Sequence, residues 1–196
     1  MGFDPVRRRI RLIVSKAGRA AWFEDRIQVA AVRQSARQVS RPVARQAYRS
    51  IDAGLIFADP RLAAIYDEID GDRCDLDHYE AIVEELGARS VLDIGCGTGV
   101  LGCRLAARGV SVTGVDPAQA SLDVARTKQA ADRITWLLGD ATTLPPFAVD
   151  AVTMTGNVAQ VFVRDEAWSA TLTGAHTALR DGGHLVFETR DPSYRG

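Results

Sequence analysis

Residues Val91 to Gly102 read VLDIGCGTGVLG, an apolar run followed by four glycines and the start of a helix-like run. Glycine occurs this densely where the backbone turns with positive φ or approaches another group closely. The glycines fit two patterns, GxGxG at Gly95, Gly97 and Gly99, and GxGxxG at Gly97, Gly99 and Gly102. Each pattern predicts a loop that binds an adenosine cofactor, but the two patterns point to different cofactors.

Strand-like and helix-like runs alternate along the chain from about Asp75 onward. Compact apolar runs predict strands at 90–95, 111–116, 134–140, 149–156 and 183–190, and helical patterns cover 77–86, 98–108, 118–130 and 165–180. Strands that alternate with helices of this length imply right-handed βαβ units around a parallel sheet. The sequence therefore predicts an α/β fold with a doubly wound, mostly parallel sheet. Ligands of such sheets bind beyond the carboxyl ends of the strands, where loop 95–99 falls.

Asp116 ends the second predicted strand, nineteen positions after Gly97. A carboxylate there is placed to accept hydrogen bonds from both hydroxyls of a ribose, although it also fits a strand-end turn ahead of Pro117. A nicotinamide dinucleotide site uses the same loop and the same acid, so this pair does not separate the two cofactors.

Two further acids favour one cofactor over the other. Asp93 lies within an otherwise apolar strand, where an unpaired carboxylate costs several kcal/mol. We expect loop amides, or a ligand through water, to satisfy it, whereas dinucleotide folds normally carry an apolar residue there. Asp140 ends the third strand, where it can accept a hydrogen bond from an adenine amino group or cap the following turn.

Five segments, VLDIGCGTG, VTGVD, GDATTLP, VDAVTMTGN and GGHLVFETR, together resemble the class I S-adenosylmethionine-dependent methyltransferases. The resemblance runs from about Phe57 to Asp191. It implies five strands in the order 3-2-1-4-5 and S-adenosylmethionine as the cofactor. It also implies that the loop glycines approach the methionine part, that Asp116 holds the ribose, and that the residues at 140–141 contact the adenine.

The resemblance adds two candidate contacts. Asn157, just after the fourth strand, would lie near the sulfonium and the acceptor. The segment IYDEIDGDR at 65–73 resembles the part that closes over the cofactor, with Tyr66 either a contact or a core aromatic. The predicted cofactor-binding residues are then Tyr66, Asp93, Gly95, Gly97, Gly99, Asp116, Asp140, Ala141 and Asn157.

The predicted activity is methyl transfer from S-adenosylmethionine to an unidentified small-molecule acceptor, and this chemistry needs no metal. No catalytic residue is assigned, because His78, His176 and His184 do not fall at the carboxyl end of a strand. Two alternatives remain open: a non-catalytic module that binds the cofactor and a partner, and an NAD-dependent dehydrogenase.

Two parts of the chain depart from the family. Members usually continue after the fifth strand with a helix and two more strands, which this chain lacks. We therefore expect HLVFE (184–188) to form an exposed sheet edge, so that the chain is a fragment, binds a partner or self-associates there.

Residues 1–53 form the second departure, and we divide the chain into this extension and a cofactor-binding domain at 54–196. Residues 1–50 hold twelve basic and three acidic residues, and arginines recur every four positions from Arg33 to Arg49. The pattern predicts a partly helical arm outside the core, interrupted at Pro42. It fits translated upstream sequence, a basic helix for nucleic acid or a membrane surface, or a helical cover over the sheet.

The bulk composition is that of a soluble globular chain, with 46% hydrophobic residues and a net charge of −1. No apolar run approaches the roughly 20 residues that span a bilayer. The three cysteines form neither an even framework nor a CxxC pair, which favours the reducing cytoplasm.

Overall fold

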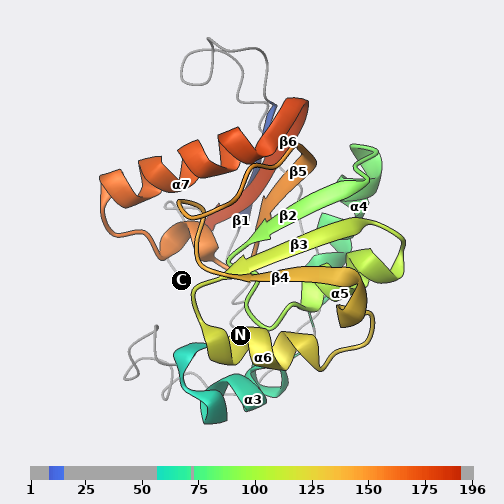
Figure 1. Cartoon of the computed structure of the whole chain (residues 1–196), viewed down its shortest axis with the longest axis vertical. Coiled ribbons are helices and arrows are strands. Elements are labelled where there is room, and N and C mark those ends of the chain that lie inside the picture. Colours follow the sequence, from blue (N-terminus) through green and yellow to red (C-terminus); the bar gives the residue numbers. More distant parts are fainter. Residues whose placement is uncertain (1–8, 16–56, 72, 191–196) are drawn as a thin grey trace, which may run out of the picture.

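The computed structural model describes residues 9–15, 57–71 and 73–190, which form a six-stranded sheet in the order β1-β6-β5-β2-β3-β4 (Figure 1). The strands are β1 Arg9–Ser15, β2 Ser90–Ile94, β3 Ser111–Asp116, β4 Ile134–Leu138, β5 Val149–Met154 and β6 Leu179–Arg190. The described α-helices are α3 Pro60–Asp70, α4 Leu76–Glu85, α5 Val100–Ala107, α6 Gln119–Arg126 and α7 Asp165–Ala178. Two short 3-10 helices, η1 Ala131–Arg133 and η2 Val158–Gln160, precede β4 and follow β5.

The five strands β2 to β6 confirm the predicted fold class and strand order. Strand β2 lies at the centre, with β3 and β4 to one side and β5 and β6 to the other, and every neighbouring pair among the five is parallel. Numbered along the domain, this order is 3-2-1-4-5. From β2 the chain first adds strands on one side, β3 and β4, and then on the other side, β5 and β6. In such sheets the ligand-binding crevice lies at this switch point, at the carboxyl ends of β2 and β5.

Strand β1 corrects the expectation that the fifth strand is an exposed edge. It pairs antiparallel with β6 over its whole length, from Arg9 opposite Arg190 to Ser15 opposite His184. The pairing satisfies backbone groups of β6 that would otherwise be open to another chain. Part of the predicted extension therefore belongs to the sheet. The arginine repeat from Arg33 to Arg49, with its predicted helix, lies outside the described residues.

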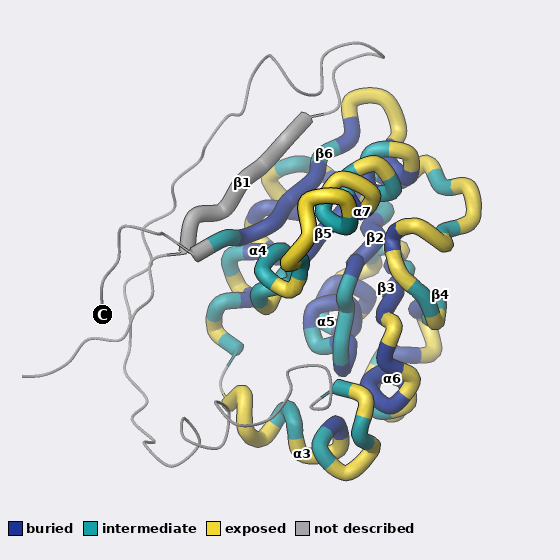
Figure 2. The backbone as a smooth tube through the Cα atoms, turned by 90° about the vertical axis from the view of Figure 1, so that its left-hand side faces the viewer, coloured by how far each residue is buried: buried dark blue, intermediate teal, exposed yellow. Residues whose placement is uncertain are grey.

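Helices cover both faces of the sheet, and each face has its own apolar core. Helices α4 and α5 pack on the face that carries Val91 and Val112, and α7 packs on the face that carries Leu92 and Leu185. The switch from Val91 to Leu92 follows from the alternation of side chains along a strand. Figure 2 shows the resulting pattern, with buried strands between helices that expose their outer sides. The layers leave the carboxyl ends of β2, β3 and β5 as the place where polar loops converge.

No helix among the described residues combines the length and apolar character needed to cross a membrane.

Candidate functional site

The loop between β2 and α5 has the backbone conformation that only glycine adopts readily. Gly95, Gly97 and Gly99 have φ values of 70°, 53° and 75°, in the left-handed region. At Gly95 a Cβ atom would also lie 2.6 Å from the Val158 side chain, whereas nothing lies within 4 Å of a Cβ at Gly97. The GxGxG pattern is thus required by the turn itself, and the turn presents open backbone at Gly97.

Gly102 behaves differently, which decides between the two glycine patterns. It sits inside α5 without a positive φ, and a Cβ there would have its nearest neighbours at 3.5 Å, an ordinary contact distance. In the dinucleotide fingerprint the last glycine allows close packing of helix on strand. No such close packing exists at Gly102. At Gly99, by contrast, a Cβ would lie 2.4 Å from the Trp136 ring. The GxGxxG match is therefore incidental.

Asp116 links the end of β3 to this loop. The Gly97 N–H donates to Asp116 Oδ2 and the Ala118 N–H donates to Oδ1, both at 2.8 Å. The Asp116 side chain is buried, and burial raises its pKa although the two amides lower it. A carboxylate has about four acceptor positions, so two remain for a ligand.

Asp93 is satisfied by a neighbouring strand rather than by the loop amides that we expected. The Thr153 hydroxyl on β5 donates to Asp93 Oδ1 at 2.6 Å, and the two residues are register partners in the parallel pair. Asp93 is 1% exposed, and this burial raises its pKa to about 7. The burial therefore favours the protonated form of Asp93 in the free protein.

A cavity of about 480 Å³ lies at the carboxyl ends of β2, β3, β4 and β5. This volume is within the usual range for a small-molecule site. Seven of the nine predicted residues line it: Tyr66, Asp93, Gly95, Gly97, Asp116, Asp140 and Ala141. Gly99 and Asn157 do not line the cavity. Gly99 belongs to the same loop, and the chain neighbours of Asn157, Gly156 and Val158, are on the cavity wall. The sequence thus brings most of its candidates to one cavity.

Asp140 combines the two positions that the sequence left open, whereas Tyr66 lies at the cavity wall and not in the core. Asp140 Oδ1 accepts hydrogen bonds from the Thr142 N–H and hydroxyl, so Asp140 caps the turn while it also lines the cavity. Tyr66 is half-buried, and its ring centroid lies 5.2 Å from that of Phe57. It belongs to an aromatic pair at the cavity wall, not to the core of the sheet.

Asn157 lies in the turn that follows β5. Its φ is 74°, its N–H donates to the buried carboxylate of Glu188 at 3.2 Å, and the Tyr79 hydroxyl donates to the other oxygen of that carboxylate at 2.7 Å. The Asn157 Oδ1 is buried and accepts no hydrogen bond from the described residues. The role that the sequence suggested for Asn157 stays a prediction.

Arg73 is a cavity residue that sequence reasoning missed. It is half-buried, lines the cavity, and forms ion pairs with Asp70 and Asp75, each at 2.9 Å. Burial alone would lower the pKa of Arg73, but the hydrogen bond to Asp75 and the two carboxylate charges raise it. The sequence could have indicated Arg73, because it ends the segment 65–73 that resembles the part closing over the cofactor. In that segment we named only Tyr66 as a contact.

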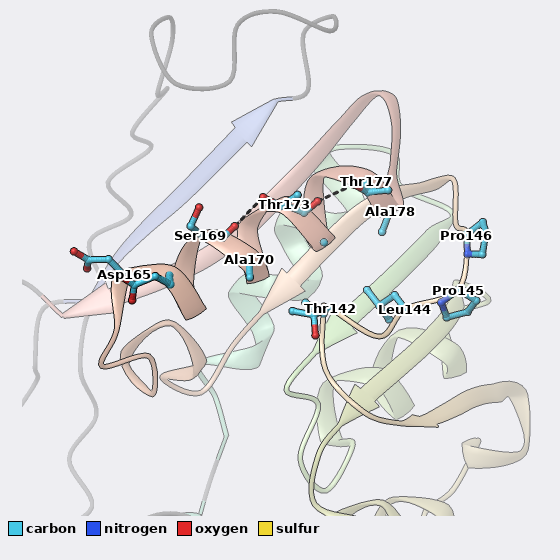
Figure 3. A pocket seen from close by; sticks show the side chains of 13 residues that line it. Thr142, Leu144, Pro145, Pro146, Asp165, Ser169, Ala170, Thr173, Thr177 and Ala178 are labelled. Atoms are coloured by element: carbon cyan, nitrogen blue, oxygen red, sulfur yellow. Dashed lines mark hydrogen bonds between the residues drawn. The ribbon is translucent and has the colours of Figure 1, made fainter.

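A second and larger hollow, of about 910 Å³, lies between α7 and the segment 141–146 (Figure 3). Its wall carries hydroxyls of Thr173 and Thr177, but both donate to carbonyls of their own helix, as the dashed lines show. Its carboxylates are Asp165 and Glu166, and both are exposed. Size alone would favour this hollow, but the convergence of buried polar groups favours the cavity at the strand ends.

Comparison with known proteins concerns the family and the fold. Residues 91–183 match the family model described as a methyltransferase domain. The cypemycin N-terminal methyltransferase of Streptomyces sp is 35% identical over 109 residues, which cover 55% of this chain and 44% of that protein. The CcbJ methyltransferase of Streptomyces caelestis has a similar structure, with a TM-score of 0.58, 26% identity, and coverage of 64% of this chain and 54% of that chain.

An S-adenosylmethionine-dependent methyltransferase of Clostridium acetobutylicum shares the fold, with a TM-score of 0.55, 22% identity, and coverage of 65% of this chain and 55% of that chain. This chain spans about half the length of its curated relatives, between 42% and 57% of the first three.

In sequence, residues 91–183 resemble a methyltransferase domain. The sheet order and the similar structure agree with the class I S-adenosylmethionine-dependent methyltransferase fold that the sequence predicted.

Proposed function

We propose that this chain is an enzyme that transfers the methyl group of S-adenosylmethionine to a small acceptor with an apolar surface. The observation that carries the proposal is the position of two buried carboxylates, Asp93 and Asp116, on adjacent strands beside the GxGxG loop. A loop of positive-φ glycines allows close approach of a ligand. The carboxylates supply acceptors for the hydroxyl and amino groups that such a cofactor presents.

Asp116 and Asp140 each have an acceptor position that fits the role assigned to it. Asp116 has unused acceptor positions for the ribose hydroxyls, because Gly97 and Ala118 occupy only two. Asp140 Oδ2 accepts no hydrogen bond from the described residues, so it can take the adenine amino group beside Ala141. The backbone at Gly95 and Gly97 lies against the methionine part.

The amino-acid end of the cofactor carries both a positive and a negative charge. Asp93 faces the amino group, directly or through water, and Arg73 pairs with the carboxylate. Among the described lining residues Arg73 is the one Lys, Arg or His. The Tyr66 ring covers the cofactor from α3, and Asn157 lies near the acceptor with an unpaired carbonyl oxygen.

The bound cofactor supplies a methyl group that is already electrophilic, because its sulfur is positively charged. The acceptor atom forms the new bond to the methyl carbon while the carbon–sulfur electron pair returns to sulfur, which gives S-adenosylhomocysteine. The protein must hold the acceptor in line with the methyl group at attack distance, and such positioning lowers the activation barrier by roughly 7–11 kcal/mol. No side chain is assigned as a general base, and the chemistry needs no metal.

The acceptor is proposed to be apolar because the cavity becomes apolar away from the carboxylates. Phe57, Val161 and Phe162 line this part, and Phe162 packs on Trp168 with ring centroids 5.5 Å apart. Val161, which lines the cavity, is 67% exposed at the surface. Exposed apolar side chains at the rim of a cavity mark a binding surface. The three free cysteines fit a cytoplasmic location, which forms part of the proposal.

The test is production of S-adenosylhomocysteine from S-adenosylmethionine by the purified chain with matched acceptors, for example benzyl mercaptan and the charged mercaptoacetate. We expect turnover with the apolar acceptor and a raised acceptor KM, at unchanged cofactor affinity, in Val161→Asp. Cofactor binding without turnover of any acceptor would support the non-catalytic module instead. Turnover that prefers charged acceptors would contradict the apolar assignment.

A further inference from the structure

Asp67, in α3, contacts the glycine loop at the cavity and the segment that follows α6. The Thr98 hydroxyl donates to Asp67 Oδ1 at 2.5 Å, and Lys128 Nζ lies 2.5 Å from Asp67 Oδ2. Thr98 is a buried residue of the GxGxG loop, and Lys128 follows the end of α6. One carboxylate thus joins α3, the glycine loop and the turn that follows α6. We call Asp67, Thr98 and Lys128 the Asp67 cluster.

Helix α3 has little else to hold it in place. Ala63 is its one buried residue, and Ile65 and Ile69 are 42% and 51% exposed. A further polar contact lies just before the helix, where the Ser121 hydroxyl donates to the Phe57 carbonyl at 3.0 Å. Elements with few buried apolar contacts open at low free-energy cost. The low burial of α3 therefore favours its separation from the rest of the domain.

Tyr66, the neighbour of Asp67 in the chain, lines the cavity from α3. Separation of α3 from the loop and from α6 would move this wall and open the cavity. We propose that Asp67 is a positioning residue that holds α3 closed over the cofactor, so that the cluster controls the rate at which the cofactor leaves. This inference rests on the proposed function as far as it concerns cofactor release, whereas the closure of α3 does not depend on it.

The side chains of the ion pair are partly exposed, 37% for Asp67 and 21% for Lys128, so dissolved salt screens their attraction. Opening of α3 is therefore expected to speed up as ionic strength rises. Lys128→Gln removes the ion pair and keeps the hydrogen bond from Thr98. Asp67→Asn removes the charge but keeps an oxygen that can accept that bond. Both changes are at partly exposed positions and leave the sheet intact.

The chain offers a matched control on α6. Arg126 and Asp123 form an ion pair at 3.0 Å on the same helix, and no described contact joins the pair to α3. Arg126→Gln therefore removes a positive charge two residues away from Lys128 without touching the Asp67 cluster.

Two measurements test the proposal on these variants. Hydrogen exchange of the α3 amides in the free protein is expected to be about threefold faster in Lys128→Gln and Asp67→Asn, the scale of a partly exposed ion pair. Dissociation of S-adenosylhomocysteine, followed by displacement with excess S-adenosylmethionine, is expected to speed up by a similar factor and to lose its dependence on salt. Arg126→Gln is expected to match the wild type in both.

Unchanged α3 exchange in both cluster variants would overturn the closing role of Asp67, whatever the cofactor does. Faster exchange with an unchanged dissociation rate would overturn its control of cofactor release. Failure of the wild type to bind S-adenosylhomocysteine would refute the proposed function and, with it, the claim about release. The exchange measurement would still decide whether Asp67 holds α3.

Discussion

The Gly97 N–H donates to the Asp116 carboxylate at 2.8 Å, across 19 residues of sequence. This bond fixes the glycine loop against the end of β3, so the group proposed to hold the ribose also shapes the loop that is proposed to receive the methionine part. A change at Asp116 is therefore expected to act on the cofactor twice, once through the lost ligand contact and once through the loop.

Asp116→Ala is expected to weaken binding of S-adenosylhomocysteine by about 1–3 kcal/mol, the scale of hydrogen bonds to a charged group. Asp116→Asn keeps one acceptor oxygen and should lose less. Titration calorimetry measures both. Asp123→Asn, an exposed carboxylate on α6, serves as the control. An unchanged affinity in Asp116→Ala would remove Asp116 from the site.

Affinity for S-adenosylhomocysteine is expected to rise with pH through neutrality. The pKa of Asp93 is raised to about 7 in the free protein because the carboxyl is buried. A nearby ammonium group favours its charged form, so the ligand must displace a proton below this pKa. Between pH 6 and pH 8 the gain is up to about tenfold for a single titrating group. Asp93→Asn should give a flat profile.

The same group sets a pH dependence of stability in the free protein. A carboxyl with a raised folded-state pKa binds its proton more tightly when folded, so it destabilises the domain increasingly as pH rises from about 4 to about 7. Asp93→Asn should therefore gain stability relative to the wild type over this interval. Thermal melts at pH 5 and pH 8 check the sign, and an equal difference at both values would contradict it.

Gly99 and Gly102 give opposite expectations for the same substitution. Gly99→Ala places a Cβ 2.4 Å from Trp136 at a positive φ, so it should destabilise the domain by about 2 kcal/mol or more. Gly102→Ala adds a methyl group at ordinary contact distance inside a helix and should be neutral or stabilise by about 0.5–1 kcal/mol. Denaturant unfolding compares them. A large loss in Gly102→Ala would revive the dinucleotide pattern.

Removal of residues 1–15 is expected to cause self-association, because it takes away β1 and exposes the edge of β6. Removal of residues 1–8 leaves β1 in place and is the control. Sedimentation velocity measures the oligomeric state of both. A monomeric product after removal of 1–15 would show that β6 does not need this cover.

The five parallel strands could be predicted because each is a short, locally apolar run bounded by turn residues. Strand β1 could not, although RIRLIV is a strand-like run, because nothing local connects it to a partner near residue 187. The pairing of β1 with β6 joins residues that are far apart in the sequence. The many arginines around β1 instead suggested an arm outside the core.

In the candidate site, too, local sequence patterns could be predicted and long-range contacts could not. Asp116 and the glycine loop could be placed from the sequence because their spacing fixes them at neighbouring strand ends. Thr153 could not be assigned to Asp93, because their contact depends on the register between β2 and β5, which are separated by two strands and three helices along the chain. Arg73 was missed because its position on the wall depends on how α3 and α4 are joined.

The most direct test of the central claim is calorimetric titration of the wild-type chain with S-adenosylhomocysteine and, separately, with NAD. We expect the wild type to bind S-adenosylhomocysteine at one site, Asp116→Ala to bind it with lower affinity, and NAD to show no measurable binding. Binding of NAD without binding of S-adenosylhomocysteine would contradict the assignment of the cavity and favour a dehydrogenase.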